Sequence, residues 1–180
     1  MTSKTKKTLK RIPISIYFSD DQIPNNYLKY SFENHHSYSV YKSEEVLLIN
    51  LSKISDLDIL QKNYKMLLIG FAMKQLCKSG SFFVDYFGCE ETNIKIFYLG
   101  WSLENYCFEK YKSKKKYKSN SEILHNYEKE IKSLCKAYFF ARDLINTPAN
   151  ILGPKEIFES AKKFLNKFTV VDKVFGKELQ

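Results

Sequence analysis

The sequence predicts an α/β fold, with a mixed sheet, flanking helices and a long linker helix after them. Short apolar runs suited to strands alternate with longer segments of helical periodicity, the pattern of a sheet covered by helices. A seven-position apolar stripe with spacings of three and four, within 121–145, predicts the linker helix. Hydrophobic residues make up 44% of the 180 and aromatic residues 16%, which suffices for a core and excludes global disorder.

Three short apolar runs in the first half of the chain predict strands. In the first run isoleucines alternate with other residues, and Pro13 suits a strand start or an edge. The second is continuous apart from Asn50, and two glycines bracket the third. Between the first two runs, the polar residues 19–37 predict a loop with one helical turn. The three strands cover 12–18, 46–51 and 82–86.

Two helices are predicted around the third strand. The segment 55–58 offers an N-cap to a helix that runs to Gly70 or beyond, although 66–71 taken alone fits a strand equally well. A second helix is predicted over 91–111. Gly100 lies inside it and costs about 1 kcal/mol relative to alanine, so it is expected to mark a close contact with another helix.

The strongest helix signal covers 121–145, with Ser121 as its N-cap. Such a helix would span about 37 Å, a length suited to joining two bodies. Pro148 ends it, because the residue before a proline is pushed out of the helical region. A further helix over 154–166 begins with a proline, and a short strand is expected over 169–171.

The hinge at 146–154 is expected to be an ordered, capped turn. Its two prolines fix φ angles, and the side chains of Asn146, Thr147 and Asn150 can bond nearby backbone groups. Arg142 and Asp143, near the end of the long helix, are expected to clamp this hinge by salt bridges. The apolar face of the helix after the hinge is expected to stay exposed or to contact another molecule.

The net charge of +9 is concentrated in two basic tracts, 4–11 and 110–118, that contain no acidic residue. The rest of the chain has a net charge of −2. Such tracts can bind phosphates in a salt-dependent way. A solvated tail and a solvated loop are the more ordinary interpretation. We therefore expect at most weak, non-specific nucleic-acid binding.

No catalytic, cofactor-binding or metal-ligating residue is assigned from the residue patterns. The spacings between the four cysteines match no zinc or redox motif, so reduced thiols are expected. His35 and His36 are expected on a surface loop, and His125 on the solvated side of the long helix. Glu90 and Glu91 suit a helix N-terminus better than catalysis.

Targeting and membrane signals are also missing from the sequence. No apolar run approaches the roughly 20 residues that cross a bilayer. The basic N-terminus is not followed by a long apolar segment, so no secretory signal is evident. A cytoplasmic protein without membrane contact is therefore expected.

Three segments of the second half form an ordered series. The first, 100–112, holds a Trp, a Tyr-x-Phe and a Tyr-Lys pair before the lysine-rich tract. The second, 141–150, reads Ala-Arg-Asp-Leu-Ile-Asn-Thr-Pro-Ala-Asn, and 153–157 reads Gly-Pro-Lys-Glu-Ile. In order and spacing they resemble the leucyl aminopeptidase family, the two-metal cytosol aminopeptidases of peptidase family M17. They match the helix that closes its N-terminal domain, its hinge and its next helix.

The resemblance implies a division of the chain into three parts. A macro-domain-like N-terminal α/β domain would cover 1–118 and a linker helix 119–145. The start of a truncated catalytic domain would cover 146–180. In the family, the catalytic domain hydrolyses peptides with two divalent metals, Mn or Zn. Its signature Asn-Thr-Asp-Ala-Glu-Gly-Arg has no counterpart here, because Asn146-Thr147 is followed by Pro148, so no catalytic residue carries over.

The chain is therefore expected to be the non-catalytic N-terminal part of a leucyl aminopeptidase and to be inactive alone. The full-length protein would remove N-terminal amino acids from peptides and form a homo-oligomer, a hexamer in the family. One alternative is a stand-alone module that binds nucleic acid weakly through the lysine tracts; some family members bind DNA. Another is a macro-like domain for ADP-ribose, which the glycine-poor loops disfavour, because close approach to a pyrophosphate favours glycine.

Overall fold

The structure, a computed structural model, describes residues 11–27, 29–111 and 120–165. The chain divides into two compact units, Met1–Phe139 and Phe140–Gln180. The basic tract 4–11, apart from its last residue, and most of 110–118 lie outside the described residues, as does the strand predicted over 169–171. The predicted division at 118 and 145 stays a prediction.

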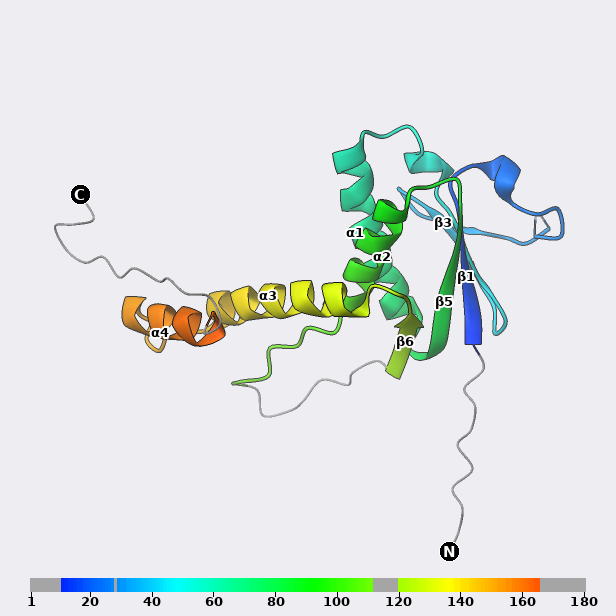
Figure 1. The fold of residues 1–180 in the computed structure, drawn as a ribbon. Coiled ribbons are helices and arrows are strands. Elements are labelled where there is room, and N and C mark those ends of the chain that lie inside the picture. Colours follow the sequence, from blue (N-terminus) through cyan, green and yellow to red (C-terminus); the bar gives the residue numbers. More distant parts are fainter. Residues whose placement is uncertain (1–10, 28, 112–119, 166–180) are drawn as a thin grey trace, which may run out of the picture. The chain divides into compact units, whose positions relative to one another are not determined.

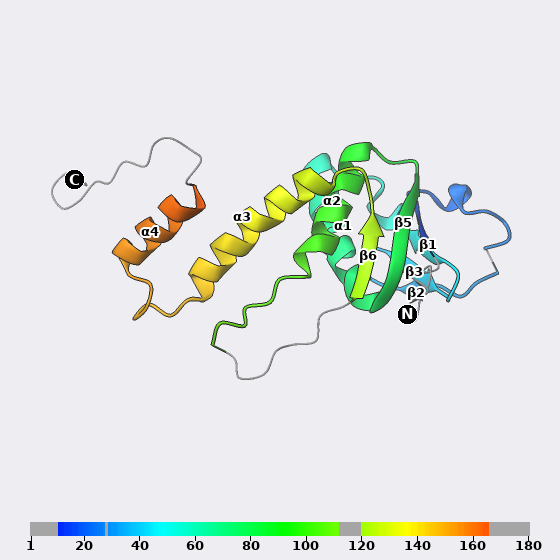
Figure 2. The ribbon, with the colours of Figure 1, turned by 60° about the horizontal axis from the view of Figure 1, so that its bottom comes forward.

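The first unit is built on a six-stranded mixed sheet with the order β2-β3-β4-β1-β5-β6 (Figure 1, Figure 2). β1 lies parallel to β4 and β5, and β5 lies parallel to β6. β3 is antiparallel to both β2 and β4. The predicted fold class, α/β with a mixed sheet and flanking helices, is thereby confirmed. The strands are β1 Arg11–Tyr17, β2 Glu33–Asn34, β3 Ser39–Lys42, β4 Leu47–Asn50, β5 Ser79–Phe87 and β6 Asn120–Leu124.

Two helices, α1 (Ile59–Leu76) and α2 (Glu91–Leu103), pack against one face of the sheet. α1 begins where the sequence predicted, since the carboxylate of Asp58 accepts hydrogen bonds from the N–H groups of Leu60 and Gln61 at 2.9 and 3.0 Å. The ambiguous segment 66–71 is helical. The predicted loop 19–37 contains the 3-10 turn Asp20–Gln22, as expected, but it also contains the short strand β2, which was not predicted.

Apolar side chains fill both faces of the sheet, because successive residues of a strand point to opposite sides. Ile14 and Ile16 join the main core with α1 and α2, while Tyr17 lies in a smaller cluster on the other face. Side chains from the segments around β2 and β3 cover that smaller cluster, including Tyr30 and Tyr41, whose rings stack at 4.3 Å.

The helix predicted over 91–111 is shorter in the structure. α2 ends at Leu103, and the side-chain Nδ2 of Asn105 donates to the carbonyl of Ser102 at 3.1 Å. This local bond competes with the next turn of helix, a common effect of asparagine. Tyr106 follows outside the helix and packs on Phe139 with ring centroids 5.4 Å apart.

The helix predicted over 121–145, with Ser121 as N-cap, is also corrected. Residues 120–124 form β6, which pairs with the edge of β5, and α3 covers Glu128–Asn146. Sheet hydrogen bonds to β5 outweigh the helical periodicity of this segment. Of the predicted apolar stripe, Ile131 is buried, whereas Leu134 and Tyr138 are more than 40% exposed. Within the proposed linker segment, residues 120–124 therefore form a strand instead of a helix.

The second unit contains the end of α3, a turn and α4 (Pro154–Phe164). The turn is ordered as predicted: the N–H groups of Ile151 and Leu152 donate to the carbonyl of Pro148 at 2.9 and 3.0 Å. The hydroxyl of Thr147 donates to the carbonyl of Asp143 at 2.6 Å. The predicted salt-bridge clamp by Arg142 and Asp143 stays a prediction.

Candidate functional site

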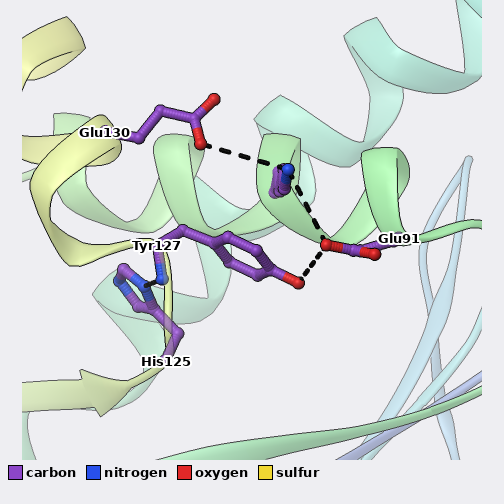
Figure 3. A network of polar contacts seen from close by, with 5 residues as sticks. Glu91, His125, Tyr127 and Glu130 are labelled. Atoms are coloured by element: carbon purple, nitrogen blue, oxygen red, sulfur yellow. Dashed lines mark hydrogen bonds and ion pairs between the residues drawn. The ribbon is translucent and has the colours of Figure 1, made fainter.

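The turn between β6 and α3 holds the most connected group of titratable side chains in the described part of the first unit (Figure 3). His125 is half-buried and stacks on Tyr98 of α2, with ring centroids 4.4 Å apart. Its Nδ1 accepts a hydrogen bond from the backbone N–H of Tyr127 at 3.1 Å, just before α3 begins. Burial lowers the pKa of His125, and nearby Glu128 opposes that shift. The predicted solvated position of His125 on a helix is therefore wrong.

Tyr127 connects this turn to the N-terminus of α2. Its hydroxyl donates to Glu91 Oε1 at 2.5 Å, and Lys95 Nζ lies 3.7 Å from the same oxygen (Figure 3). Lys95 Nζ also lies 4.6 Å from the centre of the Tyr127 ring and 4.0 Å from Glu130 Oε2. The network thus joins the first turns of α2 and α3, two helices that are separate in sequence.

The chemistry of this network favours a structural clamp. The hydrogen bond to Glu91 raises the pKa of Tyr127 to about 12, so the phenol stays protonated at neutral pH. The same bond, with help from Lys95, lowers the pKa of the Glu91 carboxyl, so Glu91 stays an acceptor. Neither group therefore changes its protonation state near pH 7, as a general acid or base would have to do. Glu91 at the first turn of α2 agrees with the structural role that the sequence predicted for it.

A second polar feature is a buried lysine of α1 that contacts both β6 and α2. Lys74 of α1 is only 2% exposed, and its Nζ donates to the backbone carbonyl of Ser121 in β6. The same Nζ lies 5.5 Å from the centre of the Trp101 ring. Burial lowers the pKa of Lys74. Lys74 also lines a pocket of about 270 Å³ beside β6 and the start of α3.

A third feature is a pocket of about 360 Å³ at the carboxyl ends of β1 and β5. Ligands of open α/β sheets often bind at such an edge. Here the lining includes Lys62 and Glu90, of opposite charge, and Asn93, whose Nδ2 donates to Asn63 Oδ1 at 3.0 Å. A Cβ at Gly88 would collide with Gln22, so this turn is already filled on one side. The pocket therefore shows no dominant charge for a ligand.

The other residues singled out from the sequence lie apart from one another in the structure. His35 and His36 are exposed near β2, and the ring of His35 stacks on Tyr38 at 4.4 Å. Burial raises the pKa of the Cys77 thiol to about 11 and that of the Cys89 thiol to about 12. Among the described residues, no three His, Cys, Asp or Glu side chains are grouped in a way that could hold a metal ion.

Lys74 and Tyr98 were not among the candidate residues predicted from the sequence. A signal for Lys74 was available, because it is one helical turn from Gly70 and follows Met73, within the part of α1 that faces the core. A lysine in such a position is either paired or functional. Tyr98 carried no comparable signal, since aromatic residues inside a helix are usually core. No helix in the described ranges is long and apolar enough to cross a membrane.

Parts of the chain are similar in sequence to known proteins. Over 112 residues the chain is 38% identical to a probable cytosol aminopeptidase of Phytoplasma mali. Over 86 residues it is 34% identical to a probable cytosol aminopeptidase of Aquifex aeolicus. The resemblance to the cytosol aminopeptidases is confirmed. The aligned regions cover 53% and 44% of this chain but only 22% and 17% of these aminopeptidases, and no protein-family model matches the chain.

Solved structures of two aminopeptidases and of a maturation enzyme share the fold. The cytosol aminopeptidase of Coxiella burnetii superposes with a TM-score of 0.59 at 19% identity, covering 92% of this chain and 37% of its own. A mutant of tomato leucine aminopeptidase gives a TM-score of 0.59 at 16% identity, with coverages of 92% and 41%. The bottromycin maturation enzyme BotP, in complex with Mn, gives 0.55 at 11% identity, with coverages of 87% and 36%. At these identities the likeness establishes the fold of the chain.

Proposed function

We propose that this chain is the non-catalytic N-terminal part of a leucyl aminopeptidase, which in the full-length protein removes N-terminal amino acids from peptides. The observation that carries the proposal is the 38% identity over 112 residues with a probable cytosol aminopeptidase. The match spans about a fifth of that relative. The hinge turn around Pro148 and the helix after it are consistent with an entry into a further domain.

The metal chemistry of such an enzyme would have to be supplied by other residues. The described part of this chain offers no group of three metal-ligating side chains, and Tyr127 and Glu91 are engaged with each other. Two divalent metals, Mn or Zn, are therefore proposed only for a full-length protein, where BotP in complex with Mn offers a structural parallel. Cytoplasmic localisation and assembly into a homo-oligomer, a hexamer in the family, belong to the same proposal.

A chimera tests this proposal. The segment of the Phytoplasma mali relative that aligns with this chain would be replaced by the corresponding residues of this chain, and hydrolysis of a leucine anilide would be measured with Mn²⁺. If the chain serves as an N-terminal domain, the chimera retains turnover and the assembly state of the parent. A folded chimera that neither assembles nor turns over would contradict it. The 180-residue chain alone, assayed in parallel with Mn²⁺ or Zn²⁺, is expected to give no turnover.

A further inference from the structure

The pocket beside Lys74 combines a buried cation with an opening to solvent. Side chains of α1, α2, β6 and α3 line it, including Lys74, Trp101, Ser102 and His125. Its volume of about 270 Å³ suits a small organic molecule rather than a peptide or a nucleotide. Neither the aminopeptidase resemblance nor the clamp at the β6–α3 turn gives this pocket a role.

Among the described residues, Lys74 has no negatively charged side chain in ion-pair contact. One N–H is donated to the carbonyl of Ser121, and the ammonium group faces the ring of Trp101. A carbonyl dipole and an aromatic face stabilise a cation, but neither neutralises it. Glu104 and Glu122 act on Lys74 only as more distant charges. Charges inside proteins are normally paired, so an anion that enters the pocket would complete this arrangement.

The other side chains of the pocket narrow the class of ligand. Lys132, at the pocket wall, is bonded to Glu128 of the same helix and is largely exposed, so it does not add a second free cation. Glu122 would repel a multiply charged anion such as a phosphate more strongly than a singly charged one. A single carboxylate matches one buried ammonium, and the partly exposed side chain of Ile123 offers an apolar surface to the rest of a small molecule, next to the buried ring of Trp101.

We propose that this pocket is a binding site for a small monocarboxylate, whose carboxylate pairs with Lys74 and whose carbon chain lies near Trp101. Glu122, at the pocket wall, would also accept the ammonium group of a free amino acid. The site is therefore able to take either a simple aliphatic carboxylate or an amino acid, and both bind through the same carboxylate.

The chain has a built-in probe for this site, because Trp101 is its only tryptophan. We would titrate the full 180-residue chain at pH 7 and constant ionic strength with sodium isocaproate, L-leucine, isoamylamine hydrochloride and sodium chloride. The readouts are Trp101 fluorescence and the NMR signal of its indole N–H. Both carboxylates are expected to give a saturable change in the millimolar range. The amine and the chloride are expected to give none.

Two matched variants distinguish a ligand site from a purely structural lysine. Lys74→Gln keeps an N–H donor for Ser121 and removes the charge, and should weaken isocaproate binding roughly tenfold or more. Lys132→Gln removes a charge from the same pocket and should leave the affinity within about twofold. Absence of a saturable change with either carboxylate in the wild-type chain would overturn the proposal, whether or not the variants fold. Equal binding by wild type and a folded Lys74→Gln variant would also overturn it.

Discussion

Gly70 of α1 and Gly100 of α2 lie at the point where the two helices approach most tightly, each against the backbone of the other helix. A Cβ on Gly70 would collide with the carbonyl oxygen of Phe97, and a Cβ on Gly100 with the carbonyl oxygen of Leu67. Backbone atoms cannot move aside as the end of a flexible side chain can. The prediction that Gly100 marks a close helix contact is thereby confirmed.

Alanine at either glycine should therefore destabilise the first unit. Gly100→Ala gains about 1 kcal/mol of helix propensity but forces the helices apart, and overpacking of this kind typically costs about 1–3 kcal/mol. Urea unfolding should show a lower midpoint for Gly100→Ala and for Gly70→Ala. Thr92→Ala, at an exposed position of α2, is the matched control and should change the midpoint little. A variant at Gly100 as stable as wild type would show that the helices can separate freely.

The half-buried ring of His125 should make stability depend on pH. Burial lowers its pKa below the ordinary value of 6.5, so just below pH 6.5 the unfolded chain binds a proton that the folded chain does not. Protonation would also remove the Nδ1 acceptor that holds the N–H of Tyr127. The free energy of unfolding should therefore fall as the pH is lowered through this window, and the loss is complete below the folded pKa.

Replacing His125 separates its contribution to the pH dependence of unfolding from that of the carboxyl groups. Glu91 and Glu128 have pKa values lowered from 4.5, so their stabilisation is lost only at more acidic pH. Urea midpoints between pH 7.5 and 5 should drop more steeply for wild type than for His125→Gln, which cannot titrate. His36→Gln, at an exposed position, should retain the wild-type slope. Equal slopes for wild type and His125→Gln would show that the ring is free to protonate in the folded state.

The sequence was most informative where local signals and tertiary packing agree. β1, β4 and β5 follow from short apolar runs, and Asp58 marks the start of α1 by its own side-chain hydrogen bonds. β3 was missed because its four residues include Ser39 and Lys42 and show no apolar run. Its formation depends on antiparallel pairing with β4, a partner in space rather than in local sequence.

The error at 121–127 has a similar cause. Leu124, Tyr127 and Ile131 are spaced as in a helix, yet the backbone of residues 120–124 finds hydrogen-bond partners in β5. Periodicity cannot reveal an open sheet edge, so strand pairing overrode it. The same error hid the Lys74 pocket, because only a strand brings the carbonyl of Ser121 to the lysine. The clamp around Tyr127 likewise depends on a turn that the sequence analysis placed inside a helix.

The two lysine tracts lead to a prediction that rests on the sequence alone. Because the remainder of the chain has a net charge of −2, polyanion binding should be weak and confined to 4–11 and 110–118. Replacing Lys114, Lys115 and Lys116 with Gln should weaken DNA binding equally for all sequences. It should also reduce the slope of log K against log salt by up to about 3. Fluorescence anisotropy with unrelated duplexes measures both, and a sequence preference that survives the substitutions would favour the stand-alone binding module.

The second unit should be much less protected than the first. No residue of α4 is buried, Ile157 is 43% exposed, and the ring of Phe164 stacks on Phe140 at 4.2 Å while remaining 41% exposed. One aromatic pair contributes about 0.5–1.5 kcal/mol beyond its buried area, too little to hold a short helix firmly. In a dilute monomer, amide hydrogens of α4 should therefore exchange far faster than those of α1.

Two experiments distinguish the possible causes of hydrogen-exchange protection in α4: a change of protein concentration and substitution of the stacked aromatic residues. If its apolar face meets a second molecule, protection of 154–164 should rise with protein concentration while that of α1 stays constant. Phe164→Ala should remove the residual protection in the dilute sample, and Phe140→Ala should do the same because the two rings stack on each other. Strong protection of α4 that is independent of concentration and survives both substitutions would mean that this helix belongs to a stable core of its own chain. This result would contradict the proposal that a catalytic domain starts at residue 146.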